Sequence, residues 1–189
     1  MKKLLGIMVL GLLWCNISFA DDIKDLQLNG MSIGDSALKY FDEAKIKKNK
    51  QKWYKNKKVT PVSITGNYGD FDTISFSYKT NDKNYLIIEV TGMKSYSDNV
   101  DQCYKQKDDE VKIIEETFPD LNPISDKGKH QGDKSGKSKF DSTEFSFKSG
   151  GFIRIACYDW SKKMDYKDHF RMGLLSAEFQ GWLVNEAYN

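Results

Sequence analysis

Two cysteines constrain the fold most, because each lies in a segment with a clear secondary-structure pattern. Cys157 lies in the run 152–160, where aromatic and β-branched residues follow a Gly-Gly turn, as in a central β-strand. Cys103 lies on the apolar stripe of a helical pattern that ends before Pro119. A bond between these cysteines would therefore tie a helix to a strand 54 residues away in the sequence.

The first twenty residues have the pattern of a secretory signal peptide. Lys2 and Lys3 precede an apolar run at 4–14, and Ala20 precedes two aspartates. We expect cleavage near Ala20 and a periplasmic or secreted protein. A membrane anchor is the alternative, but the apolar run is much shorter than the roughly 20 residues that a spanning helix needs.

The sequence predicts a signal peptide followed by one exported domain. Cys15 would be lost with the signal peptide, and an oxidising compartment would favour a disulfide between Cys103 and Cys157. The alternative is a pair of buried free thiols. The expected organisation is a signal peptide at 1–20 and a single α+β domain at 21–189, with a mobile polar loop near 120–139.

The patterns of apolar residues predict an α+β domain in the order ααβββαβββα, with a mostly antiparallel sheet of about five to six strands and helices packed on one face. The three-stranded first half should form a meander. The expected helices are 32–41 capped by Ser32, 43–48 capped by Asp42, a helix capped by Ser97 or Asp98 that runs to Phe118, and a helix after Ser176. The expected strands are 59–65, 70–78, 85–91, 140–147, 152–160 and 168–175.

Two serine motifs overlap in the segment 30–36. One is G-x-S-x-G around Ser32, and the other is Gly-Asp-Ser ending at Ser36, which resembles the opening motif of SGNH-type esterases. The residues before the segment are too polar for the buried strand that a nucleophile elbow requires, and Tyr166 stands three residues before His169, where the esterases have an acid. We expect no catalytic site. A serine esterase using Ser36 or Ser32 with His169 is the alternative.

Sites for nucleotides and metal ions are not expected. The segment 132–138 resembles a phosphate loop, but only three residues separate its glycines where the motif needs four. His130 and His169 have no partners at the spacings of a zinc or calcium site. The sequence therefore predicts neither a cofactor nor a metal ion.

Charge is balanced over the chain but lysines are clustered. The formal net charge of +2 is accounted for by Lys2 and Lys3, so the expected mature domain is neutral and its overall charge does not favour a nucleic-acid partner. The segment 45–58 carries eight lysines and no acid. It is either a solvated surface or a patch that binds anionic glycans or lipid headgroups. The candidate binding residues there are Lys50, Lys52, Trp53, Tyr54 and Lys55.

Three segments, 30–36, 157–161 and 178–188, are similar to those of an uncharacterised group of small exported bacterial proteins. That resemblance implies export but no particular activity. A weaker resemblance, confined to 30–32 and the helix expected after it, is to periplasmic domains of the BamE type, which are scaffolds in outer-membrane assembly. We therefore expect a non-catalytic periplasmic protein that binds an envelope component or acts as a small scaffold. Its partner would be an envelope polymer, a lipid surface or another envelope protein.

Overall fold

The structure of the protein is a computed structural model that describes residues 22–97 and 99–189. The predicted signal peptide, Cys15 and Asp98 lie outside the described residues. In chain order the elements are η1 (Ile23–Asp25), η2 (Ala37–Lys39), α1 (Glu43–Lys48), β1 (Val59–Tyr68), β2 (Phe71–Lys79), β3 (Glu89–Ser95), α2 (Val100–Thr117), β4 (Pro123–Lys129), β5 (Lys139–Ser146), β6 (Phe152–Asp159), η3 (Lys162–Met164), β7 (His169–Leu175) and α3 (Ala177–Asn185).

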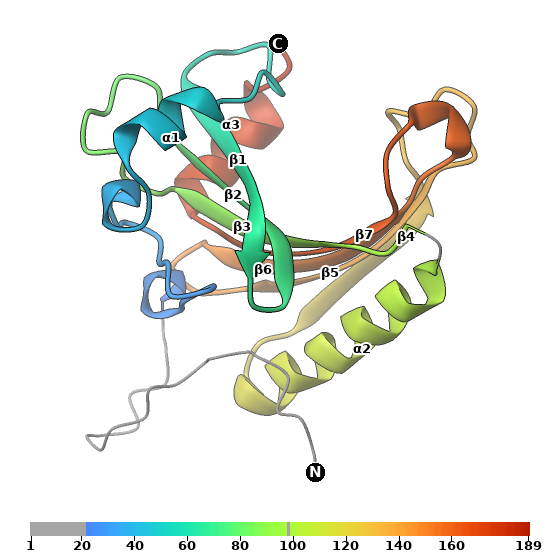
Figure 1. Cartoon of the computed structure of the whole chain (residues 1–189). Helices are drawn as coiled ribbons and strands as arrows, with labels where there is room; N and C mark the ends of the chain where they lie inside the picture. Colours follow the sequence, from blue (N-terminus) through green and yellow to red (C-terminus); the bar gives the residue numbers. More distant parts are fainter. Residues whose placement is uncertain (1–21, 98) are drawn as a thin grey trace.

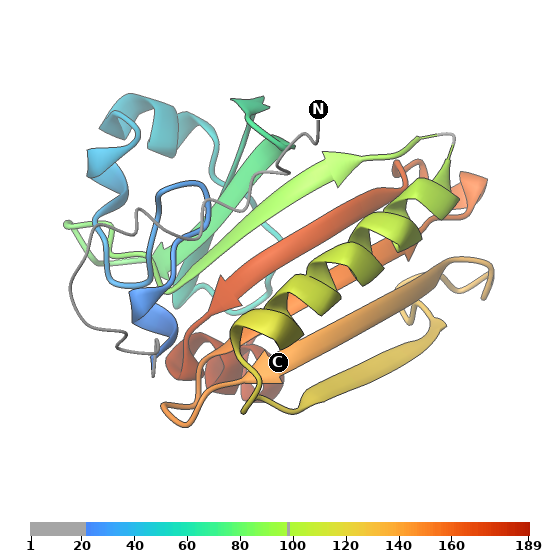
Figure 2. The same ribbon diagram turned by 90° about the horizontal axis from the view of Figure 1, so that it is seen from below.

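One sheet organises the whole domain. Its strand order is β1-β2-β3-β7-β6-β5-β4, and all neighbours are antiparallel. Two meanders, β1 to β3 and β4 to β7, meet where β3 pairs with β7, and α2 runs beneath the sheet on the way from β3 to the far edge strand (Figures 1 and 2). The prediction of an α+β fold with a first-half meander is confirmed, but the sheet has seven strands, not five or six.

The additional strand is β4, which lies where we expected a loop at 120–139. All seven of its residues are exposed, so no apolar pattern marks the strand. Backbone pairing with β5 defines it instead, helped by a 3.0 Å contact between the hydroxyls of Ser125 and Thr143. Pro123, at its first residue, is compatible with an edge strand because the missing N–H disturbs no central ladder.

The predicted strand 85–91 is shifted along the chain. Tyr85 has a positive φ of 53°, and the next two residues pair with the N-terminal segment at 34–36, so β3 begins only at Glu89. An apolar pattern does not distinguish sheet residues from others that are buried under a neighbouring segment. The pattern therefore predicted burial correctly and placed the strand too early.

Two of the three predicted helix caps are wrong. Asp42 accepts a hydrogen bond from the first turn of α1, as predicted, and Ser176, after which the last helix was expected, caps α3. At the other two helices the caps are Ser36, before the short η2, and Asn99, before α2. Polar residues precede each helix in a row, and sequence does not tell which of them adopts the capping geometry.

Helices lie on both faces of the sheet, whereas we expected them on one. We call the face under α2 the closed face and the opposite face the open face. The closed face carries the main apolar core, to which η1, η2, α1 and α2 contribute. A smaller core on the open face forms where α3 covers one end of the sheet. Its buried members are Val59, Ile88, Phe152, Leu175, Phe179, Trp182 and Ala187.

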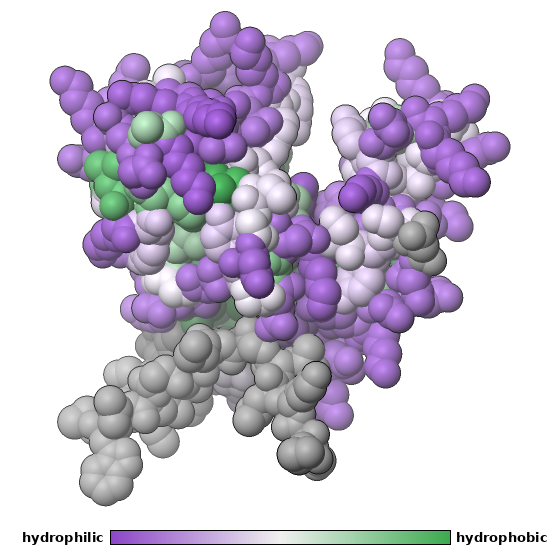
Figure 3. All heavy atoms as spheres, in the orientation of Figure 1, coloured by the Kyte–Doolittle hydropathy of each residue, from purple (hydrophilic) through white to green (hydrophobic). Residues whose placement is uncertain are grey.

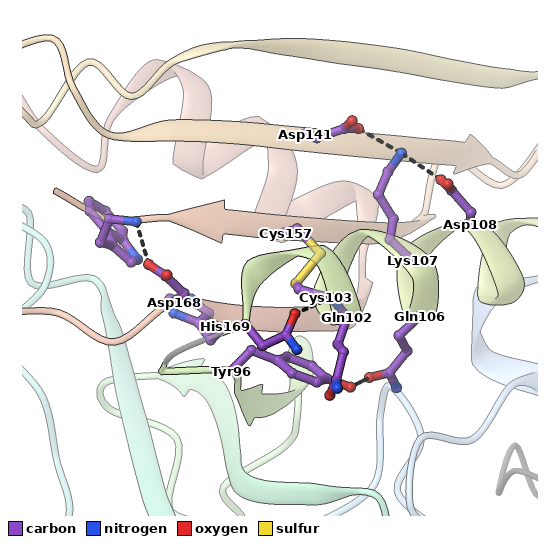
Figure 4. Close-up of a disulfide and its surroundings, with 12 residues drawn as sticks. Tyr96, Gln102, Cys103, Gln106, Lys107, Asp108, Asp141, Cys157, Asp168 and His169 are labelled. Carbon is purple, nitrogen blue, oxygen red and sulfur yellow. Dashed lines mark hydrogen bonds and ion pairs between the residues drawn. A yellow bond between two sulfur atoms is a disulfide. The ribbon is translucent and has the colours of Figure 1, made fainter.

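A disulfide fixes α2 to the closed face. Cys103 of α2 and Cys157 of β6 are fully buried and bonded, with an S–S distance of 2.08 Å (Figure 4). One turn further along α2, the ammonium of Lys107 lies 2.6 Å from a carboxylate oxygen of Asp141 on β5. The predicted tie between helix and strand is therefore present, and an ion pair extends it to the next strand.

Candidate functional site

The middle of the open face has no helix over it. Figure 3 shows the surface hollowed between two rises, which Figure 1 identifies as the side of α1 and α3 and the side of η3. The small residues at the centre of this face are called its floor: Thr91 of β3, Ala156 of β6 and Gly173 of β7, all of which are buried. A Cβ atom on Gly173 would lie 2.5 Å from Oγ1 of Thr91, so a larger residue at this position would collide with the Thr91 side chain.

The only two arginines of the chain, among 29 basic residues, lie on this face. Arg154 on β6 pairs with Gly173, and Arg171 on β7 pairs with Ala156. The two arginines are therefore diagonal neighbours whose side chains project from the same face. A guanidinium presents a planar fork of donors that fits carboxylates and phosphates. The use of arginine at these two positions of a lysine-rich chain therefore indicates that bidentate hydrogen bonding is needed there.

The two arginines differ in their partners. Arg154 donates from Nε to Oε1 of Glu144 at 2.5 Å. Arg171 lies over the ring of Tyr158, 5.4 Å from its centroid, and its Nη2 is 3.3 Å from the sulfur of Met93. Within the described residues no carboxylate oxygen lies within 4.0 Å of Arg171, and its Nε has no hydrogen-bond partner. Arg171 is thus a positioned cation without an ion-pair partner in the described part of the chain.

A buried carboxyl lies on the same face, next to the floor. Glu89 accepts hydrogen bonds from the hydroxyls of Ser77, at 2.9 Å, and Thr91. Burial raises the pKa of Glu89, although these two hydroxyls and the charges of Arg171 and Arg154 act in the opposite direction. Burial is the largest of these influences and favours the neutral acid.

Aromatic rings form one wall of the hollow beside Arg171. Tyr158 and Trp160 stack nearly parallel, with an interplanar angle of 11° and centroids 5.8 Å apart. His130 packs against Trp160, and Tyr166, which is 61% exposed, meets the same ring edge-on at 4.9 Å. Rings of this kind offer flat apolar surfaces next to a cation.

His169 is held neutral in this wall. Burial, followed by the charge of Arg171, lowers the pKa of His169 to about 4. Its Nδ1 lies 2.9 Å from the carbonyl oxygen of Lys167, which can only accept, so Nδ1 carries the proton and Nε2 is an acceptor. Nε2 has no partner among the described residues. The ring stacks on Tyr158 at 5.1 Å and contributes to the wall.

The structure does not bring the predicted esterase residues together. Ser36 pairs with Leu86 just before β3, whereas His169 pairs with Ser95 at the far end of that strand, about 30 Å away at roughly 3.3 Å per residue. The hydroxyl of Ser36 caps η2 and donates to the carbonyl oxygen of Asn84 at 2.6 Å. Ser32 lies in the turn before Ser36, where its carbonyl oxygen accepts from the amide of Asp35 at 3.2 Å.

The lysines of the lysine-rich segment are exposed, whereas Ile46 is fully buried and Tyr54 is half-buried. Tyr54 packs between the residues of α3, with its ring centroid 4.8 Å from that of Trp182, and burial raises its pKa. The amide of Lys55 donates to the carbonyl of Ala187 at 3.0 Å. Tyr54 therefore fixes the loop to the domain and is not a surface contact. The exposed candidates are Lys50, Lys52, Trp53 and Lys55.

The segment that resembles a phosphate loop binds a carboxylate of its own. Asp133 accepts from the amides of Ser135, at 2.8 Å, and Ser138, at 3.0 Å, and from the hydroxyl of Ser161 at 2.7 Å. These hydrogen bonds lower the pKa of Asp133, so the carboxylate is ionised. The amides that would have to hold a phosphate are therefore already occupied.

Within residues 22–97 and 99–189, no cluster of three or more histidine, cysteine or acidic side chains is arranged to hold a metal ion. In that same part of the chain, no helix has the length and apolar character needed to cross a membrane. Comparison of the chain with protein families, curated proteins and solved structures finds no match.

Sequence reasoning missed the arginine pair. A signal was present in the sequence, because only two of the 29 basic residues are arginines. Both of them lie in segments with the pattern of a β-strand. What sequence could not supply is the strand order that makes Arg154 and Arg171 neighbours.

Proposed function

We propose that the protein is an exported, non-catalytic binding protein that holds an acidic polysaccharide of the cell envelope on the open face of its sheet. The observation that carries the proposal is the placement of Arg154 and Arg171 side by side on the open face, whose middle no helix covers. Arg171 supplies a guanidinium that has no ion-pair partner among the described residues, and Arg154 supplies a second fork of donors.

The aromatic wall favours a sugar over a simple anion. The C–H faces of sugar rings pack on flat aromatic rings, and Tyr158, Trp160 and the exposed Tyr166 lie beside the cation in that arrangement. A carboxylated sugar would contact the rings and the guanidinium groups together. The signal-peptide pattern at 1–20 supports the envelope as the place of binding.

Binding without catalysis is supported by the chemistry of the same face. His169 is neutral and its Nδ1 is committed to a backbone carbonyl, while Glu89 is enclosed by two hydroxyl groups. Among the described residues no serine or cysteine lies within hydrogen-bond distance of the His169 ring, and the serine that contacts Glu89, Ser77, is fully buried and out of reach of a substrate.

The test is a titration of the purified protein with polygalacturonate, with neutral dextran and phosphatidylglycerol vesicles in parallel. We expect saturable binding of polygalacturonate that weakens with salt, and no binding of dextran. Arg171→Gln should weaken it at least tenfold, the loss of a charged hydrogen-bonding group. Arg171→Lys should recover only part of it, because an ammonium keeps the charge and loses the fork.

Lys112→Gln is the matched control, since this exposed lysine lies on α2, on the other side of the sheet, and its removal changes the net charge equally. If Arg154→Lys/Arg171→Lys binds polygalacturonate as tightly as the wild type, the proposed site is wrong. If vesicles bind instead, and replacement of Lys50, Lys52 and Lys55 by Gln abolishes that binding, the lysine-rich segment is the functional surface and the arginine site is rejected.

A further inference from the structure

A cavity of about 380 Å³ lies on the opposite side of the sheet from the arginines. It is enclosed by the N-terminal segment 26–30, the turn between β1 and β2, and α2, all on the closed face (Figures 1 and 2). Its walls are largely apolar. The apolar lining residues are Leu26, Leu28, Phe71, Ile114, Phe118, Ile153, Met172 and Leu174.

A single carboxyl group of α2 faces this apolar space. Glu110 lines the cavity and is only 7% exposed, and its Oε2 has no hydrogen-bond partner within the described residues. An unpartnered buried acceptor costs free energy unless something occupies the position next to it. The chain therefore keeps an acidic group where an apolar residue would be more stable.

The groups around Glu110 are mainly acidic. Burial raises its pKa to about 7, and the carboxylates of Asp70 on the β1–β2 turn and Asp109 on α2 act in the same direction. A hydrogen bond from Gln106 and the charge of Lys94 on β3 oppose the shift. The polar residues contributed by the N-terminal segment, Gln27 and Asn29, do not titrate.

The charge of the lining discriminates between ligand classes. Asp70 and Glu110 are its charged residues, and it includes no lysine or arginine. A carboxylate or phosphate entering the cavity would meet like charges, whereas an ammonium group would meet a buried acceptor and a second carboxylate. The apolar walls add favourable contacts for a hydrocarbon chain.

We propose that this cavity binds an aliphatic primary amine, with its ammonium group on Oε2 of Glu110 and its hydrocarbon chain against the apolar walls. This site is separate from the arginine site and does not depend on the proposed function. The ammonium satisfies the free acceptor of Glu110, and the chain fills space that the packing of α2 on the sheet leaves open.

Calorimetric titrations with octylamine, octanol and octanoate test the proposal with one chain length and three head groups. We expect octylamine to bind most tightly and octanoate most weakly at pH 6.5. Glu110→Gln should weaken octylamine at least tenfold and change octanol less than twofold, because only the amine needs a carboxylate. Glu115→Gln, at an exposed position of the same helix, should change neither.

Proton release gives an independent measurement. With a pKa near 7, Glu110 is mostly protonated at pH 6.5, so binding of an ammonium should release most of a proton per ligand. Titrations in buffers of different ionisation enthalpy measure that release, which Glu110→Gln should abolish. A thermal scan of each variant verifies folding. The proposal is overturned if no probe binds saturably, if octanoate binds more tightly than octylamine, or if Glu110→Gln leaves octylamine binding unchanged.

Discussion

The two faces of the sheet use the same strands for different purposes. On the closed face, Phe145 and Phe170 are fully buried, and a disulfide fixes α2 to this face. On the open face, the corresponding alternate positions carry hydroxyls, small residues and two arginines. Because the closed face supplies the apolar core and the covalent tie, the middle of the other face can remain uncovered. The comparison predicts that residues of the closed face determine stability and that residues of the open face determine binding.

Neighbouring residues of β7 give the largest expected contrast. Phe170 points into the closed core and Arg171 into the open hollow. Phe170→Ala should lower the free energy of unfolding by about 3–5 kcal/mol. Arg171→Gln should lower it by about 1 kcal/mol or less, since it loses one cation–π contact. Urea denaturation measures both. Equal losses would show that the open face is also part of the stabilising core.

Removal of the disulfide is the next largest change. It closes a loop of 54 residues, and the loss of chain entropy in the unfolded state predicts a stabilisation of about 4 kcal/mol. Cys103→Ala/Cys157→Ala should therefore denature at much lower urea concentration. Polygalacturonate binding by the protein that remains folded should be unchanged, because neither cysteine faces the hollow. Loss of binding at concentrations where circular dichroism shows the native fold would contradict the separation of the faces.

The buried carboxyl of Glu89, on the open face, should make the stability of the protein depend on pH. Its folded-state pKa is raised above the ordinary 4.5, so its contribution to stability is complete below pH 4.5 and is lost as pH rises through the folded-state value. Glu89→Gln removes the ionisation, and the variant should gain stability relative to the wild type as pH increases from 4 to 8. Urea midpoints at several pH values give the difference between the two proteins. Parallel curves would mean that the pKa of Glu89 is the same in the folded and unfolded states.

Sequence predicted elements that bury apolar side chains and failed where backbone pairing alone defines a strand. In β2, which was expected at 70–78, Ile74, Phe76 and Tyr78 alternate with polar residues, and all three are buried on the closed face. Such alternation is typical of a strand with one solvent-exposed face, yet Ser75 and Ser77 are buried too, and the hydroxyl of Ser77 donates to the carboxyl of Glu89. Whether such polar residues are buried depends on their partners on the neighbouring strand, and the sequence of one strand does not reveal those partners.

The candidate sites were harder to predict than the core. The cysteine pair followed from the count of cysteines and the helical periodicity, which are local signals. The arginine pair and the cavity at Glu110 require the strand order and the placement of α2. Glu110 lies among other acidic residues of a helix that is polar over most of its length, and nothing in the sequence separates it from its solvated neighbours.

The smallest expected effect concerns the helix that limits the open face at one end. Ser176 accepts a hydrogen bond from the amide of Phe179 at 3.2 Å and caps α3. Ser176→Ala should cost about 1 kcal/mol of unfolding free energy, and Ser176→Thr should recover most of it. Both are measured by urea denaturation.

Binding by the Ser176→Ala variant decides how far the hollow extends. The side chains of Phe179 and Trp182 pack α3 onto Phe152 and Leu175, the ends of the two strands that carry the arginines. If polygalacturonate affinity stays within twofold of the wild type, the ligand contacts only the middle of the face. A larger loss that Ser176→Thr reverses would show that α3 forms a wall of the site, so that stability and binding overlap at this end of the sheet.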